Sequence, residues 1–137
     1  MATREELFEF WIDRLAELEG VSMDADALVE DVIVLAVAFN QDPDVFPLVM
    51  TNVIKAFQNL LHQRNAGQPL TGNHVGWLSF HFQSRAIRKL KADMRIVYRD
   101  TGSTLEILGF GHRWIPQEIY QRLLLDRRKK RDSEDNR

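Results

Sequence analysis

The chain has 137 residues, no cysteine, 45% hydrophobic and 28% charged residues, and a formal net charge of -2. This length and composition fit one domain with an apolar core, and they argue against a disordered chain, a disulfide scaffold or a zinc-thiolate module. The N-terminus lacks the basic region of a signal peptide, and no stretch reaches the roughly 20 apolar residues of a membrane-spanning helix. With no cysteine present, we expect a cytoplasmic protein outside the membrane.

The near-neutral total hides two halves of opposite charge. Residues 1–60 carry 3 basic and 12 acidic side chains, a net charge of -9, whereas residues 61–137 carry 15 basic and 8 acidic side chains, a net charge of +7. Such asymmetry indicates that the basic part binds a polyanion. The total of -2 therefore does not exclude a nucleic-acid partner.

The acidic half predicts three helices. In residues 4–19, apolar side chains recur every three or four positions, and Gly20 follows as a stop. Residues 24–40 are acidic at their start and almost entirely apolar after Leu28, which predicts a central helix. After Asp42-Pro43-Asp44, an apolar stripe from Phe46 to Leu61 predicts the third helix.

The basic half begins with a loop and then changes its periodicity. Residues 64–76 hold three glycines and a proline. Residues 77–82 and 94–99 alternate with a period of two, which predicts two strands, and a turn over residues 100–103 leads into a third strand over residues 104–110. Pro116 opens a last helix that reaches Leu125, and residues 126–137 are a charged tail expected to be disordered.

This order of elements predicts an α+β fold, with N-terminal helices followed by a small antiparallel sheet and a C-terminal helix. We expect a single domain over residues 1–137. It divides into an acidic helical part (1–63), a loop (64–76), a sheet-and-helix part (77–125) and the tail (126–137).

Cations are concentrated in the middle of the basic half. They lie before the second strand, on one face of it and at the end of the third strand: Arg85, Arg88, Lys89, Lys91, Arg95, Arg99, His112 and Arg113. An antiparallel hairpin can bring these positions to one sheet face, where they would bind phosphate. Trp114 is placed either to stack on a base or to wedge beneath the last helix. The histidines lack metal-ligand spacing and no glycine-rich phosphate loop or serine elbow is present, so no metal and no cofactor are predicted.

The order of these residues resembles a known family. The strand Arg95-Ile96-Val97-Tyr98-Arg99, a short turn, Leu105-Glu106-Ile107-Leu108, then Gly111-His112-Arg113 and a helix with Tyr120 resemble the C-terminal half of RelE/ParE-superfamily toxins of bacterial type II toxin–antitoxin modules. The resemblance is strongest over residues 94–120. RelE-like members cleave messenger RNA in the ribosomal A site. The resemblance therefore implies a ribosome-dependent endoribonuclease (an mRNA interferase) with a cognate antitoxin protein as its partner.

The resemblance also implies roles for single residues. Arg95 would stabilise the phosphate, Arg113 would act on the leaving group or the developing charge, and Tyr120 would orient or stack on the nucleotide. His112 would take part in proton transfer. No metal is needed when the ribose 2′-OH attacks the adjacent phosphate, and this requirement makes the substrate RNA. Further RNA contacts are expected from Arg85, Arg88, Lys89, Lys91, Arg99 and Trp114.

Family members open with a β-strand that pairs into the sheet before a helical hairpin, and no such strand is predicted in this N-terminus. Two other functions fit the basic half: a non-catalytic superfamily member that binds a protein such as a topoisomerase, and an interaction module for an acidic partner or DNA. The acidic carboxylates have two interpretations as well. They are either the solvent faces of helices or a layer that restrains the basic sheet within the same chain.

Overall fold

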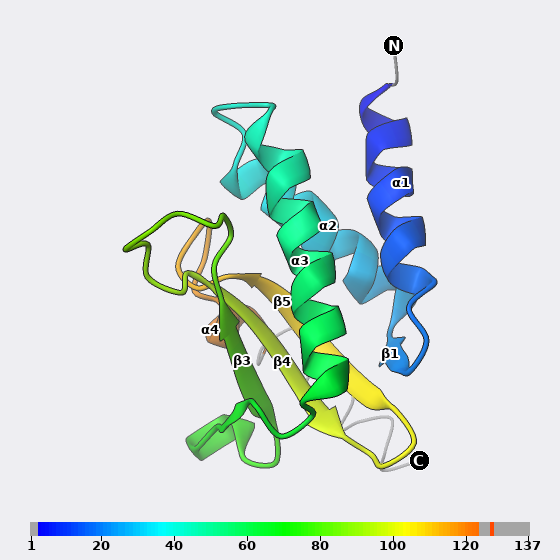
Figure 1. Ribbon diagram of the computed structural model, residues 1–137, viewed down its shortest axis with the longest axis vertical. Helices are drawn as coiled ribbons and strands as arrows, with labels where there is room; N and C mark the ends of the chain where they lie inside the picture. Colours follow the sequence, from blue (N-terminus) through cyan, green and yellow to red (C-terminus); the bar gives the residue numbers. More distant parts are fainter. Residues whose placement is uncertain (1–2, 124–126, 128–137) are drawn as a thin grey trace.

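The computed structural model describes residues 3–123 and residue 127 (Figure 1). Three helices occupy the acidic half, as the sequence predicts: α1 (Arg4–Ala16), α2 (Ala25–Ala38) and α3 (Val45–His62). The side chains of Thr3 and Asp24 cap α1 and α2, because each accepts a hydrogen bond from the backbone N–H three residues later, at 3.1 and 3.0 Å. None of the described helices is long and apolar enough to cross a membrane.

A five-stranded sheet has the strand order β1-β5-β4-β3-β2. The three longer strands, β3 (Leu78–Phe82), β4 (Met94–Asp100) and β5 (Leu105–His112), are antiparallel and correspond to the predicted strands. Two short strands that the sequence did not predict, β1 (Val21–Met23) and β2 (Gln68–Pro69), form the edges. The α+β prediction is confirmed. The sheet is mixed rather than antiparallel, because β1 pairs with β5 in parallel.

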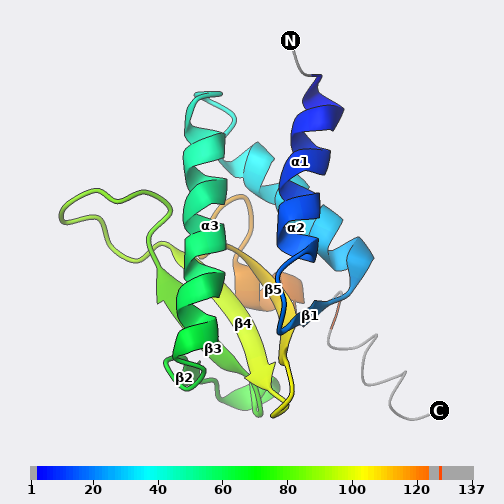
Figure 2. The ribbon, with the colours of Figure 1, turned by 45° about the vertical axis from the view of Figure 1, so that its right-hand side comes forward.

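The N-terminal helices cover one face of this sheet and form the main core with it (Figures 1 and 2). Met94, Ile96 and Tyr98 of β4 point into this core and are fully buried. Successive side chains of a strand point to opposite faces, so Arg95 and Val97 lie on the face away from these helices. The alternation in the sequence thus separates the helix-covered face from the face that carries the cations.

A short helix, α4 (Ile119–Leu123), packs on the sheet face away from the N-terminal helices. A 3-10 helix, η1 (Gly72–His74), precedes β3. Ile119 and Leu123 form a smaller core with Val97. The helix can approach β5 because Gly109 has no side chain: a Cβ at that position would overlap the side chain of Leu123. Gly109 is therefore required by packing rather than by its own backbone conformation.

One buried carboxylate joins the acidic half to the basic half. Asp31 of α2 is fully buried and accepts a hydrogen bond from the backbone N–H of Phe110 at 3.0 Å. The same carboxylate pairs with the guanidinium groups of Arg122 at 2.6 Å and Arg127 at 2.5 Å. A buried charge is tolerated only when it is paired and hydrogen-bonded, and Asp31 meets both conditions.

The two arginines also complete the hydrogen bonds at one edge of β5. β1 pairs with β5 only over residues 105–107, so the following carbonyls on that edge have no strand beside them. Arg127 donates to the carbonyl of Leu108 at 3.0 Å, and Arg122 donates to the carbonyl of Phe110 at 3.4 Å. Side chains thus take the place of a longer β1, which satisfies backbone groups that would otherwise be buried without partners.

The predicted charged tail over residues 126–137, and the predicted end of the last helix at residues 124–125, lie outside the described residues apart from Arg127. The sequence predicts a solvated Arg127, whereas the structure buries it against Asp31. The physical reason is the unpaired part of the β5 edge, which provides a carbonyl for the guanidinium group to bind.

We predict that Asp31→Asn lowers the free energy of unfolding by about 3 to 5 kcal/mol, because it removes the buried counter-charge of two guanidinium groups and leaves them only the more distant Glu30. Urea denaturation measures this loss. Glu30→Gln is the matched control, since Glu30 pairs with the same two arginines at 3.4 and 3.3 Å but is 44% exposed. It should cost less than about 1 kcal/mol. Equal losses in the two variants would contradict the central role of Asp31.

Candidate functional site

The candidate site lies on the sheet face away from the three N-terminal helices. Two chemically active side chains are cross-strand neighbours there, because His81 of β3 pairs in register with Arg95 of β4. Directly opposed residues of antiparallel strands project to the same face. On the other side of Arg95, the register places Gly111 of β5, which has no side chain to cover the guanidinium group.

Arg95 is held in place by the backbone rather than by a carboxylate. Its Nη1 donates to the carbonyls of Ala92 at 2.6 Å and Met94 at 2.9 Å. The side chain is only 8% exposed, and its buried Nε has no hydrogen-bond partner among the described residues. A buried, unsatisfied cationic donor is costly, and an anionic oxygen would satisfy it once the guanidinium group turns toward the surface. Arg95 thus offers an anion a positive charge that no carboxylate pairs with among the described residues.

Arg113 follows β5 and is fixed by three neighbours. Its backbone N–H donates to the carbonyl of Asp93 at 2.8 Å. Its guanidinium group pairs with Glu118 at 2.5 Å and lies over the ring of Tyr120, 4.7 Å from the ring centre. The ion pair is partly exposed, so an incoming anion can compete with Glu118 for the guanidinium group.

Tyr120 of α4 is anchored at both ends on this face. Its hydroxyl group and the Ser79 hydroxyl of β3 are 2.7 Å apart, and its backbone carbonyl accepts a hydrogen bond from His74 Nε2 at 2.8 Å. The ring therefore has a fixed orientation beneath Arg113. Of the predicted catalytic residues, the structure brings Arg95, Arg113 and Tyr120 to one face.

The structure does not bring His112 to that face. His112 pairs in register with Met94, so it points toward the helices, where its ring contacts Phe39 at 5.9 Å between centres. Its Nδ1 accepts hydrogen bonds from the backbone N–H groups of Trp114 at 3.1 Å and Ile115 at 3.0 Å. Burial lowers the pKa of His112, and this effect exceeds the opposite one of Asp93. His112 is thus a neutral residue that holds the chain after β5.

His81 is the histidine that the structure places beside the cations, and the sequence analysis assigned it no role. Partial burial lowers its pKa below 6.5, and the positive charges of Arg95 and Arg113 lower it further. The ring is exposed and is neutral at pH 7, so it can accept a proton. Its position in the β3 alternation, on the side of Ser79, was visible in the sequence. The register that sets it against Arg95 was not.

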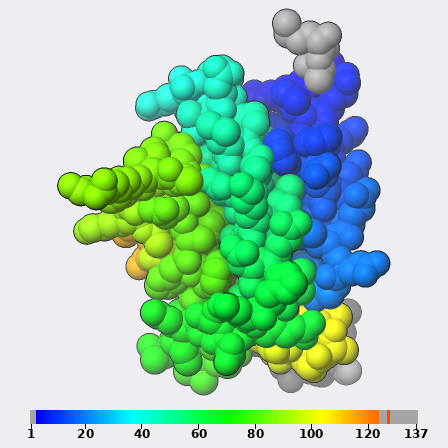
Figure 3. Space-filling view, viewed as in Figure 1, coloured from blue at the N-terminus to red at the C-terminus, as the bar shows by residue number. Residues whose placement is uncertain are grey.

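The other predicted RNA-binding residues lie around this centre. Three of them, Arg88, Lys89 and Lys91, are exposed on the connection between β3 and β4, which protrudes from the body of the molecule (Figures 1 and 3). Arg85, on the same connection, is half-buried. Hydrogen bonds of 2.7 and 2.8 Å between Ser84 and Asp93 close the connection at its base. These cations form a basic extension next to the site.

Arg99 and Trp114 have different surroundings. Arg99 lies further along β4, pairs with Glu106 at 2.7 Å and stands over the ring of Trp77 at 4.7 Å. Its charge is thus largely engaged within the protein. Trp114 is 53% exposed and lies 5.8 Å from the Arg113 guanidinium group, so its ring is open to stacking.

Among the residues that the structure describes, no group of three or more His, Asp or Glu side chains could hold a metal ion. The chain matches no family model, no curated protein and no solved structure. Its function is therefore inferred from the geometry of this site.

Acid should destabilise the protein through His112. Because the folded state lowers its pKa below 6.5, the unfolded chain binds the proton more readily. The stability that neutral His112 provides is complete above a pH of about 6.5 and is lost as the pH falls toward the folded-state pKa. Urea denaturation of wild type and His112→Asn checks this: the advantage of the wild type should shrink between about pH 7.5 and pH 5.5. A constant difference would contradict it.

Proposed function

We propose that the chain is the toxin of a bacterial type II toxin–antitoxin module and acts as a RelE-like, ribosome-dependent endoribonuclease on messenger RNA. The observation that carries this proposal is the gathering of His81, Arg95, Arg113 and Tyr120 on one sheet face. Two cations for phosphate, a neutral histidine for a proton and an aromatic ring for a nucleotide are the groups that metal-free RNA cleavage requires.

The topology supports the same proposal. β1 precedes the helical pair α2–α3 and pairs in parallel with β5. RelE/ParE members open with a strand that pairs into the sheet before a helical hairpin, which is the feature that the sequence analysis did not find. In this chain the strand follows an additional helix, α1, and has only three residues. The resemblance thus extends from the C-terminal half to the order of elements before it.

In the proposed reaction, the 2′-OH of a ribose attacks the adjacent phosphorus while His81 accepts the hydroxyl proton. The bond from phosphorus to the 5′-oxygen breaks, and the leaving oxygen takes a proton from water, which gives a 2′,3′-cyclic phosphate and a 5′-hydroxyl end. Arg95 donates to the non-bridging oxygens of the phosphate, and Arg113, released from Glu118, stabilises the charge on the leaving oxygen. Tyr120 positions the nucleotide. His81 thus takes over the proton transfer that the resemblance implied for His112.

The basic extension on the β3–β4 connection would contact the RNA backbone of the ribosome, since its exposed cations have no ion-pair partner among the described residues and such cations bind phosphate through counterion release. Trp114, beside Arg113, would stack on a base. An acidic antitoxin protein would oppose these contacts by covering the same face.

We expect Arg95→Ala and Arg113→Ala each to reduce cleavage of ribosome-bound messenger RNA by about 10²–10³-fold, because each removes a donor to developing charge. Primer extension on translating ribosomes measures the cleavage. Arg14→Ala on α1 is the control and should keep full activity, since Arg14 stacks on Phe10 on the helical side of the molecule.

Induced expression separates this proposal from its alternatives. Growth arrest with cleaved transcripts supports it, whereas arrest with a DNA-damage response and intact transcripts identifies a topoisomerase inhibitor. If growth does not stop, the remaining interpretation of the chain is an interaction module. A messenger with one 2′-deoxynucleotide at the cleavage position should resist cleavage, because the attacking hydroxyl is missing. Its cleavage would rule out the 2′-OH mechanism.

His81→Ala should lower the cleavage rate by about 10²–10⁴-fold, the range for loss of a general base. In the wild type, the rate should stay at its plateau as the pH falls through about 6.5 and should decline only below the depressed pKa of His81, where the ring becomes protonated. Single-turnover cleavage across pH measures both effects. His62→Ala, at the exposed end of α3, is the control. An unchanged pH profile in His81→Ala would exclude this residue as the base.

A further inference from the structure

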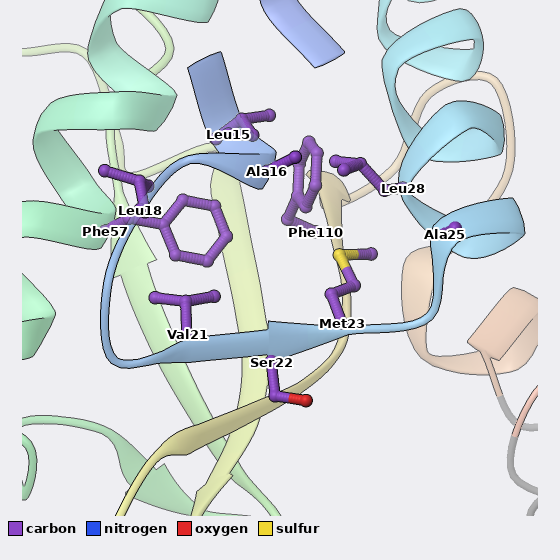
Figure 4. A pocket seen from close by; sticks show the side chains of 10 residues that line it. All are labelled: Leu15, Ala16, Leu18, Val21, Ser22, Met23, Ala25, Leu28, Phe57 and Phe110. Atoms are coloured by element: carbon purple, nitrogen blue, oxygen red, sulfur yellow. The ribbon is translucent and has the colours of Figure 1, made fainter. Parts of the chain in front are cut away.

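An apolar cavity of about 300 Å³ lies on the other side of the molecule from the cations, beneath the segment that connects α1, β1 and α2 (Figure 4). Buried side chains from four elements form its inner wall: Leu15, Leu28, Phe57 and Phe110. Val21 and Met23 of β1 also point into it (Figure 4). This cavity shares no residue with the candidate site on the cationic face.

The side chains of the wall are mainly apolar. Among the described residues that line the cavity, Ser22 provides the sole hydroxyl group, and its side chain points away from the cavity (Figure 4). None of these described residues has a charged side chain. Ligand sites for polar molecules place several polar groups against the ligand, whereas the side chains that point into this cavity are apolar and its polar surface comes from the backbone. The cavity is therefore best suited to a hydrocarbon group.

The volume distinguishes this cavity from an ordinary packing defect. Protein interiors are close-packed, and voids much larger than one water molecule are few. A dry apolar cavity of about 150 Å³ suffices to bind benzene or xenon. With about 30 Å³ for each water-sized group, the present cavity has room for an aliphatic chain of up to about ten carbon atoms.

The charge around the opening selects the polar end of such a molecule. Ala16, Ser22 and Ala25 are exposed lining residues, and the segment between and just beyond the two alanines carries four exposed carboxylates: Glu17, Glu19, Asp24 and Asp26. Described cations near this segment are already paired: Arg64, close to Gly20, pairs with Asp100 at 3.3 Å, and Arg127, which donates to the Ala27 carbonyl, pairs with Glu30 and Asp31. A cation is favoured beside these carboxylates and an anion is disfavoured.

We propose that this cavity binds the aliphatic chain of a cationic amphiphile, a medium-chain alkyl amine in chemical class, with the chain inside and the ammonium group at the acidic rim. Binding is independent of RNA cleavage, because the cavity and the cationic face use different residues. Occupation should stabilise the folded state, since the ligand binds that state alone.

Calorimetric titration with decylamine, 1-decanol and decanoate, each below its micellar concentration, tests the proposal. Decylamine should bind with a stoichiometry of one and raise the melting temperature, and decanoate should bind at least about tenfold more weakly. The absence of saturable decylamine binding would overturn the cavity as a ligand site. Equal affinity for decanol or decanoate would overturn the role of the acidic rim.

Two variants of the same strand locate the binding. Val21→Phe fills the cavity and should reduce decylamine affinity more than tenfold, whereas Ser22→Phe, whose side chain points away, should leave it unchanged. Circular dichroism confirms the fold of each variant, and Leu18→Phe replaces Val21→Phe if the latter does not fold, because Leu18 also lines the cavity. Undiminished binding in a folded cavity-filling variant would place the amine elsewhere and refute the proposal.

Discussion

The fold depends on one buried carboxylate. Asp31 brings its charge from α2 to the edge of β5, where it meets a backbone N–H and two guanidinium groups. Without these partners, the carboxylate and the arginines would each be too costly to bury. Arg122 belongs to α4, so the same interaction fixes that helix on the sheet face. The positions of Tyr120 and of the segment that follows Arg113 thus depend on an acidic residue from the opposite half of the chain.

This arrangement shows where the acidic and the basic half of the sequence lie in the fold. The acidic helices cover the apolar face of the sheet, and Arg95 and Arg113 lie on the other face. The acidic half therefore does not form a layer over the cations of the site. In the described part of the chain, the ion pairs between the halves join Glu30 and Asp31 to Arg122 and Arg127, at the edge of β5. The two charged surfaces are largely separate.

The sequence predicted the elements whose periodicity extends over several residues, which are α1 to α3 and β3 to β5. It did not predict β1, because three residues are too short for an alternation pattern and their partner lies more than 80 positions away. Side-chain alternation alone also could not show whether His81 or His112 lies on the same sheet face as Arg95. Because His112 and Arg113 are adjacent, their side chains point to opposite faces of the sheet, and the register decides which of them shares a face with Arg95. The same register brings His81 to the site.

The base of the β3–β4 connection has a consequence for how this protein can change over evolution. Ser84 and Asp93 bind each other, His112 lies 3.6 Å from the same carboxylate, and together they close the connection where it leaves the sheet. The exposed side chains of residues 86–89 lie beyond this closure, whereas the carbonyl of Ala92 still accepts a hydrogen bond from Arg95. Exchanges of charge at these exposed positions can change the surface of the connection and leave the sheet face with His81 and Arg95 intact. The two surfaces can then diverge at different rates within one small fold.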